Sequence, residues 1–373
     1  MTAIADRRAA REWKKARLVL ELKRAASTRG IPVASDESLN RMIREWESGR
    51  RPLVGDYLEL FCAVYGCSPA ELGCFPEDAP EPELDEVSSL KRELLAARSV
   101  DTSMVKLFES QTENLRQMDR RLGAESLLPQ IVAHVGQMEK LLQHGVASGA
   151  RQLVAGALTE AAALAGWQAL DLGRYGDAWN LHEVAKAAAR EAGNSTLLAH
   201  ATAQQAYVLM DLEQPTEAVQ LVQQAVAHGE GKVPALMTTW LHAAEGEAHA
   251  VAGNSSACRR SLDRADASLP VDAADPELPF LFLAGSHLAR WRGNCLARLG
   301  ADEAIEDLSG ALSAMDEGFN RAEAGVRCDL AGALLKRGDT SEATVQAEKA
   351  RELAALTGSV RQRIRIQRIL DLA

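Results

Sequence analysis

Three side chains between residues 242 and 249 have the types and the spacing that could bind a metal ion. His242, Glu245 and His249 stand at i, i+3 and i+7, so their side chains fall near one face of a helix. Both histidines also occupy packing positions of a repeated unit described below, which favours a buried structural role. The cysteines between Cys62 and Cys74 lack the spacing of a zinc site, and no fourth ligand accompanies them. The sequence therefore predicts neither a metal nor a cofactor.

Sequence motifs of catalysis are also missing. The chain has no phosphate-binding Gly-x-x-x-x-Gly-Lys-Ser/Thr, no Gly-x-Gly-x-x-Gly after a strand, no Gly-x-Ser-x-Gly and no His-Glu-x-x-His. We therefore expect that the protein is not an enzyme. No apolar run approaches the roughly 20 residues that a membrane span needs, and no secretory segment follows Met1. We expect a cytoplasmic protein without a membrane partner, and its six scattered cysteines indicate no disulfide framework.

The stretch from Ser35 to Pro52 carries polar groups that could contact a nucleic acid. Its pattern predicts a helix that begins at Ser35 or Asp36 and ends at Gly49. The apolar positions share one face of this helix: Leu39, Met42, Ile43 and Trp46. Donors that can read base edges lie away from that face, at Asn40, Arg41 and Arg44, and Arg50 and Arg51 follow where a phosphate backbone could be held. Most basic helical faces contact only solvent. Whether this helix contacts a nucleic acid therefore has to be judged from the rest of the sequence.

The charge of the chain is unevenly distributed. The formal net charge is −10, yet residues 1–51 contain 13 Lys/Arg and 7 Asp/Glu, whereas residues 74–373 contain 29 and 42. A basic N-terminal segment before an acidic body indicates an anionic partner at the N-terminus only. Ordinary charge fluctuation is the alternative explanation.

The elements that position this stretch form a small helical domain over residues 1–74. A helical pattern runs from Arg7 to Thr28, and Gly30-Ile-Pro32 interrupts it. After the helix from Ser35 to Ser48, further helices are predicted at Asp56–Tyr65 and Ala70–Leu72. About 70 residues are enough for independent folding.

The phrases Trp46-Glu-Ser-Gly49 and Tyr65-Gly-Cys-Ser-Pro69-Ala-Glu-Leu72 resemble the second half of a Cro/repressor-type (Xre family) helix-turn-helix domain. In that family the helix that ends in Glu-x-Gly is the recognition helix or leads out of it. The resemblance implies a double-stranded DNA operator as partner. It assigns base or phosphate contacts to Ser38, Asn40, Arg41 and Arg44, and backbone contacts to Arg50 and Arg51. Only a short link joins Gly30 to Ser35, so either the scanning helix is degenerate or the numbering of the helices is shifted by one.

Residues 75–86 contain three prolines and six acids and are the clearest linker in the chain. A helical connector follows over residues 87–145, with helices predicted at Val87–Arg98 and Thr102–Leu122. In the second of these, apolar residues recur every seven positions, which fits a dimer seam or intramolecular packing equally well: Phe108, Leu115 and Leu122, with Met104 and Met118 alongside. The phrases Met118–Ala124 and Leu127–His134 resemble the connector of actinobacterial Xre-type regulators.

Residues 146–373 repeat one helix-turn-helix pattern five times. Small residues recur at fixed positions, one on each side of a short polar turn: Gly166 and Ala178, Ala206 and Ala218, Gly246 and Cys258, Gly293 and Ala304, Ala331 and Ala343. The pattern resembles tetratricopeptide repeats, with the segment Ala267–Pro279 as the longest interruption. A helix at Ser359–Leu372 would cap the stack, and we interpret its arginines as a solvated face.

In tetratricopeptide stacks the first helix of each pair lines the concave groove. Projecting that frame onto this chain gives eight inward positions: Trp167, Tyr207, Glu247 and Asn294 in one row, His200, Trp240 and His287 in another, and Arg290 one turn before Asn294. Arg290 and Asn294 resemble a clamp for a carboxylate, because guanidinium and amide groups both donate to its oxygens. The aromatic residues would supply apolar contact area. For each residue the alternative is packing between helices.

The sequence thus predicts an all-α fold with an N-terminal helix-turn-helix domain, an α-helical connector and a tetratricopeptide-like α-solenoid. The function that fits is a DNA-binding transcriptional regulator that forms a homodimer and senses a peptide or a small molecule. The alternative is a repeat scaffold for protein interactions whose DNA-binding head is vestigial.

Overall fold

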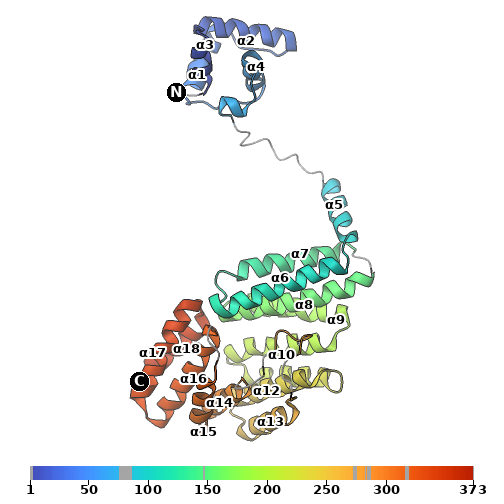
Figure 1. Cartoon of the computed structure of the whole chain (residues 1–373), viewed down its shortest axis with the longest axis vertical. Coiled ribbons are helices and arrows are strands. Elements are labelled where there is room, and N and C mark those ends of the chain that lie inside the picture. The colour runs from blue at the N-terminus through green and yellow to red at the C-terminus, as the bar shows by residue number, and fades with distance from the viewer. Residues whose placement is uncertain are drawn as a thin grey trace. The chain divides into compact units, whose positions relative to one another are not determined.

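The computed structural model describes residues 3–74, 86–145, 148–271, 275–281, 283, 287–315 and 319–372. These residues form helices and no strand, so the predicted all-α class is confirmed (Figure 1). The chain divides into two compact units, Met1–Ser89 and Leu90–Ala373, which are described one after the other. Apart from Glu86, the predicted linker 75–86 lies outside the described residues.

The first unit is a small bundle with its own core. Its helices are α1 (Ala3–Ala10), α2 (Lys15–Arg29), α3 (Asp36–Glu47), α4 (Asp56–Tyr65) and a 3-10 helix (Ala70–Leu72). Three aromatic rings hold the centre, since Trp46 lies 5.5 Å from Phe61 and Phe61 lies 5.8 Å from Tyr65 between ring centroids. All three side chains are buried, so the apolar face of α3 packs entirely into this core.

The N-terminal part of this unit differs from the sequence prediction. The single helix predicted from Arg7 to Thr28 is wrong, because the chain breaks between α1 and α2, where Glu12 has φ 56°. The break lets Trp13 pack against the core, and the Arg8 guanidinium donates to the Trp13 carbonyl oxygen at 2.8 Å. The predicted helix at Ser35 is confirmed, since the Ser35 hydroxyl caps α3 by accepting from the Ser38 amide at 3.4 Å.

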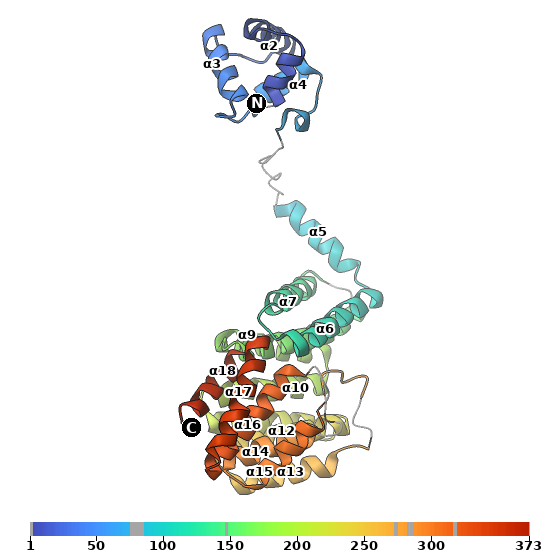
Figure 2. The same ribbon diagram turned by 60° about the vertical axis from the view of Figure 1, so that its left-hand side comes forward.

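The second unit is built from helix pairs. Its elements are α5 (Glu86–Arg98, from residue 90), α6 (Thr102–Leu122), α7 (Leu128–Gln143), α8 (Ser148–Asp171), α9 (Tyr175–Ala192), α10 (Ser195–Asp211), α11 (Pro215–Gly229), α12 (Ala235–Val251), α13 (Ser255–Ser268), α14 (His287–Leu299), α15 (Glu303–Ser313), α16 (Asn320–Arg337), α17 (Thr340–Thr357) and α18 (Val360–Leu370). From α8 to α17 each odd-numbered helix packs on the helix before it, which gives the five predicted tetratricopeptide-like pairs (Figure 2).

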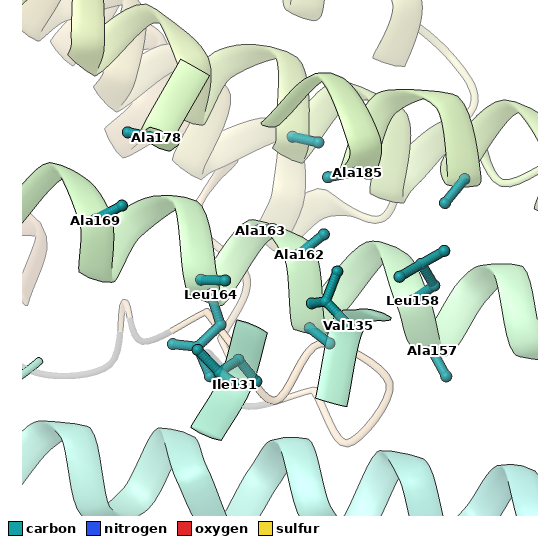
Figure 3. Packing of buried hydrophobic residues seen from close by; sticks show 14 of the residues in the cluster. Ile131, Val135, Ala157, Leu158, Ala162, Ala163, Leu164, Ala169, Ala178 and Ala185 are labelled. Atoms are coloured by element: carbon teal, nitrogen blue, oxygen red, sulfur yellow. The ribbon is translucent and has the colours of Figure 1, made fainter. Parts of the chain in front are cut away.

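Small residues at the repeated positions let the paired helices approach closely. A Cβ atom added to Gly166 would lie 2.8 Å from the His182 ring, and one added to Gly293 would lie 2.7 Å from Leu308. Alanines have the same role between α7, α8 and α9, where Ala162, Ala163 and their neighbours fill the contact (Figure 3). The pattern of small residues therefore reports helix packing, as the sequence predicts.

Helix α8 is apolar around most of its circumference because it has neighbours on several sides. Its segment Gly149–Asp171 is long and apolar enough to cross a membrane by length and composition, which the sequence reading overlooked. Of the most apolar window, 72% is buried against α6, α7, α9, α10 and α18. The core helix of a folded protein passes the same test, so this segment is weak evidence for a span.

The predicted heptad seam on α6 is mostly internal. Phe108 and Leu115 are buried, and the Phe108 ring lies 5.8 Å from the His134 ring of α7. Leu122 remains exposed at 57%. Of the two interpretations left open by the sequence, intramolecular packing therefore holds for the first two positions of the repeat.

The repeats curl until the last helices meet the first. Helix α18 packs on α8, and α16 and α17 contact α6, as the red and green helices show in Figure 1. The backbones come so close that a Cβ atom on Gly123 would lie 1.8 Å from the carbonyl oxygen of Thr357. We call this closed arrangement of α6 to α18 the ring.

Ion pairs between residues far apart in sequence hold the ring together. The Arg361 guanidinium donates twice to the Asp211 carboxylate, 150 residues earlier, at 2.6 and 2.7 Å. On the same helix, Arg365 pairs with Asp329 of the neighbouring α16. The Ser359 hydroxyl donates to Asp171 at 2.7 Å. The interpretation of the C-terminal arginines as a solvated face is therefore wrong for Arg361 and Arg365. Arg361 and Arg365 face the inside of the ring, whereas Arg363 and Arg368 are exposed to water.

Candidate functional site

The ring contains a half-open cavity of about 340 Å³. The first helices of all five pairs line it, together with α6, α18 and the segments before α14 and α16. The eight positions that the sequence proposed for an effector all border this one cavity: Trp167, His200, Tyr207, Trp240, Glu247, His287, Arg290 and Asn294. Volumes of this order suit small organic ligands.

Aromatic rings form one part of the wall. Trp167 and Tyr207 meet edge to face with centroids 5.6 Å apart. The His200 ring lies 4.9 Å from Trp240 and 4.2 Å from Phe280. Burial lowers the pKa of His200 to about 3, so its imidazole is neutral at physiological pH and behaves as a further flat ring. This part of the wall offers apolar contact area without a charge of its own.

Glu247 on α12 joins three repeats at the cavity wall. One of its carboxylate oxygens accepts from the Tyr207 hydroxyl at 3.0 Å and from the Trp291 indole N–H at 3.1 Å. The other oxygen lies 3.7 Å from the Arg298 guanidinium. Burial and the neighbouring Glu247 charge raise the pKa of Tyr207 well above its usual value, so the phenol stays a donor. These bonds fix the orientation of both aromatic side chains.

The predicted carboxylate clamp is only half available. The Asn294 amide nitrogen already donates to Asp329 at 2.7 Å, and its oxygen accepts from Arg298 at 3.3 Å. The Arg290 guanidinium instead lies over the Trp291 ring, 5.2 Å from its centroid. Asn294 is thus part of the wall, and Arg290 is the group that remains to meet a ligand.

Sequence reasoning missed several cavity residues, some outside the first helices of the repeats and some on them. Phe280 comes from the long interruption after α13, where Leu278, Leu281 and Leu283 anchor the segment against α12. The i, i+4 spacing of Arg361 and Arg365 was a usable signal for one face of the last helix. The remaining charged residues lie on α6, α8 and α16, and the sequence alone did not show that they face one cavity: Arg116, Asp119, Arg120 and Glu160, with Arg321.

The histidines weighed as metal ligands have a packing role. The Glu245 carboxylate accepts from Arg264 at 2.6 Å and from the Ser261 hydroxyl at 3.1 Å, both on α13. His242 and His249 lie 3.6 and 3.9 Å from the same carboxylate. Burial would raise the pKa of Glu245, but its hydrogen bonds and the Arg264 charge lower it. Within the described residues no group of three His, Cys, Asp or Glu side chains could hold a metal ion.

The residues proposed for DNA contact divide into two groups. The Ser38 hydroxyl accepts from Ser35 at 3.2 Å, and the Asn40 amide donates to the Asp36 carbonyl oxygen at 3.0 Å, so both are engaged within α3. The four arginines are exposed: Arg41 and Arg44 on the outer face of α3, and Arg50 and Arg51 after it. Arg41 and Arg51 lie 4.0 and 3.7 Å from Glu45, contacts of surface groups that cost little to break.

No family model and no curated protein matches this sequence. Among solved structures, the chain is similar to TPR-like repeats of a Podosopora anserina kinesin light chain, with 17% identity and a TM-score of 0.35 over 52% of this chain and 94% of that chain. It is also similar to a Rap protein complexed with competence and sporulation factor, with 13% identity and a TM-score of 0.41 over 99% of this chain and 98% of that chain. At such low values the likenesses say nothing about the ligand of this chain.

Proposed function

We propose that the protein is a cytoplasmic, homodimeric transcriptional regulator that binds DNA with its first unit and an effector, either a peptide or a small molecule, within its ring. The observation that carries the proposal is the outer face of α3. Its inner face is committed to the core through Trp46, while Arg41 and Arg44 point to solvent. A helix with one face fixed and guanidinium groups on the other can enter the major groove of DNA.

The ring supports the second half of the proposal. Eight positions chosen from the repeat frame border one cavity rather than scattering among helix interfaces. A cavity whose aromatic walls are interrupted by convergent polar groups is the usual form of a small-ligand site. Two DNA-binding heads on a dimer would engage two half-sites, and effector binding would act on their relative placement.

The DNA half is tested with the full chain and an operator selected from a random DNA library by the wild-type protein. In a gel shift we expect the double variant Arg41→Ala with Arg44→Ala to lose binding by about two orders of magnitude, because each base or phosphate contact contributes about 1–3 kcal/mol. The salt dependence of the residual binding should also become shallower. Far-UV circular dichroism should remain unchanged.

The matched control removes the same charge elsewhere in the unit. Arg17 and Arg24 are exposed on α2 and both pair with Glu21, at 2.7 and 3.4 Å. Replacing both with alanine should leave specific DNA binding within a few-fold of wild type. Equal losses in the two double variants would refute the role of α3. If the wild-type chain selects no DNA even at low salt, the protein is instead a repeat scaffold with a vestigial head.

A further inference from the structure

The cavity of the ring is basic although the protein is acidic. Seven arginines and five carboxylates line it, in a chain of net charge −10. Each carboxylate already has a guanidinium partner: Glu160 with Arg116, Asp119 and Asp171 with Arg321, Glu247 with Arg298, and Asp329 with Arg365. The acidic groups of the wall are therefore neutralised by the protein itself, and the excess charge left for a ligand is positive.

Three cavity arginines lie outside these pairs. Arg361 is bound to Asp211 and Arg120 also interacts with another group, so the third, Arg290 on α14, is the cation left for a ligand. Within the described part of the chain its guanidinium forms neither an ion pair nor a hydrogen bond, and it lies over the face of Trp291, 5.2 Å from the ring centroid. Removal from water lowers the pKa of Arg290, although Asp329 and Glu247 act in the opposite direction. A guanidinium has five N–H donors, so a partly buried one without acceptors is a site for an anion.

The surroundings of Arg290 favour an apolar body attached to that anion. The whole chain has six tryptophans, and three of them border this cavity: Trp167, Trp240 and Trp291. Two further rings belong to neutral His200 and to Phe280. The His200 ring contacts both Trp240 and Phe280. Flat rings of this kind pack well against an aromatic ligand.

We propose that the ring binds a compact organic anion, whose charged group pairs with Arg290 and whose apolar or aromatic body packs between the tryptophans. The size of the cavity, about 340 Å³, suits one such molecule. This inference rests on the proposed effector-binding role of the ring, and it names the chemical class of the effector.

The test compares two fluorescent probes that share one aromatic framework. Anilinonaphthalene sulfonate carries an anionic group, and phenylnaphthylamine is the same ring system without it. Both are titrated into the full chain and followed by their fluorescence. We expect the wild-type protein to bind the sulfonate with one site per chain and at least about tenfold more tightly than the neutral probe, which corresponds to about 1.4 kcal/mol.

Two methionine variants on the same helix separate the role of Arg290 from general effects. Arg290→Met should weaken binding of the sulfonate at least about tenfold and leave the neutral probe unchanged, since methionine keeps the apolar volume and removes the donors. Arg292 is exposed and pairs with Asp307 at 3.2 Å, so Arg292→Met should change neither affinity. Thermal unfolding of both variants tests whether the ring is still folded.

Several results would overturn the inference. Equal affinity of the wild type for both probes, or unchanged sulfonate binding by Arg290→Met, removes the anion site while leaving effector binding and DNA binding intact. If neither probe binds the wild-type chain, the effector-binding role fails together with the inference. If Arg290→Met behaves as expected but neither probe changes the DNA affinity in the gel shift, the ligand class stands and the regulatory proposal fails.

Discussion

Closure of the ring depends on the contact between Arg361 and Asp211, and this contact can be tested by one substitution. Arg361 stands on α18 and Asp211 ends α10, 150 residues earlier. The two parallel hydrogen bonds at 2.6 and 2.7 Å make the pair bidentate. Arg361→Met keeps most of the side-chain volume, removes both bonds and leaves Asp211 without this partner.

The size of the effect follows from the burial of the pair. The side chains are 13% and 16% exposed, so both charges are largely removed from water. Removing one partner of a buried pair costs about 3–5 kcal/mol, because the other charge stays uncompensated. Some exposure remains and lets water reach Asp211, so we expect a loss of about 3 kcal/mol in the free energy of unfolding. For a unit of this size that corresponds to a fall in Tm of roughly 6–9 °C.

The assay is thermal unfolding of the full chain, followed by circular dichroism. The control is Arg363→Met on the same helix, where the side chain is exposed, and its Tm should stay close to wild type. A double-mutant cycle with Asp211→Asn isolates the pair, and its coupling should be about 1 kcal/mol or more. A Tm for Arg361→Met equal to that of Arg363→Met would refute the claim that this pair holds the ring closed.

Two further predictions concern the stability of the repeats. Glu213 has φ 59° in the turn between α10 and α11, where the equivalent turns have Gly173 and Gly253, so Glu213→Gly should raise stability by about 1 kcal/mol, measured by urea unfolding. Burial lowers the pKa of His200 to about 3, below its unfolded value, so stability falls by about 1.4 kcal/mol per pH unit as pH drops from about 6.5 towards 3. In His200→Gln, the free energy of unfolding from urea titrations should lose that pH dependence between pH 6 and 5. An unchanged midpoint for Glu213→Gly, or an unchanged slope for His200→Gln, would contradict the reasoning.

The five repeats were predictable from the sequence because their determinants are local. Gly166 faces His182 and Gly293 faces Leu308 across one turn, so each small residue is followed by its packing partner within about 16 positions. The same frame selects the first helices as the inner wall, and it brings Trp167, Tyr207 and the other proposed positions to one cavity. A periodic pattern thus carries both the fold and the inward direction of a side chain.

The closure of the ring could not be predicted from the repeat pattern. The contacts that make it join residues 150 to 202 positions apart, such as Arg361 with Asp211 and Arg321 with Asp119. Arginines on a terminal helix look alike in sequence whether they face water or a distant carboxylate. Phe280 could not be predicted as a cavity residue for a related reason. It lies in an interruption between repeats, where no repeat pattern indicates the direction of a side chain.

The residues that close the ring also border the cavity. Ring closure and ligand binding are therefore thermodynamically linked. Arg361 pairs with Asp211 and its guanidinium lies over the Trp167 ring, 5.7 Å from the centroid. Arg298 contacts both Glu247 and Asn294 on the cavity wall. A ligand that binds only the closed ring stabilises closure by RT ln(1 + [L]/Kd), about 2.7 kcal/mol at a hundredfold excess over Kd. Because such coupling is reciprocal, a substitution that leaves only a fraction of the rings closed lowers the apparent ligand affinity by that fraction. Arg361→Met therefore predicts a loss of ligand affinity even if no ligand atom touches Arg361.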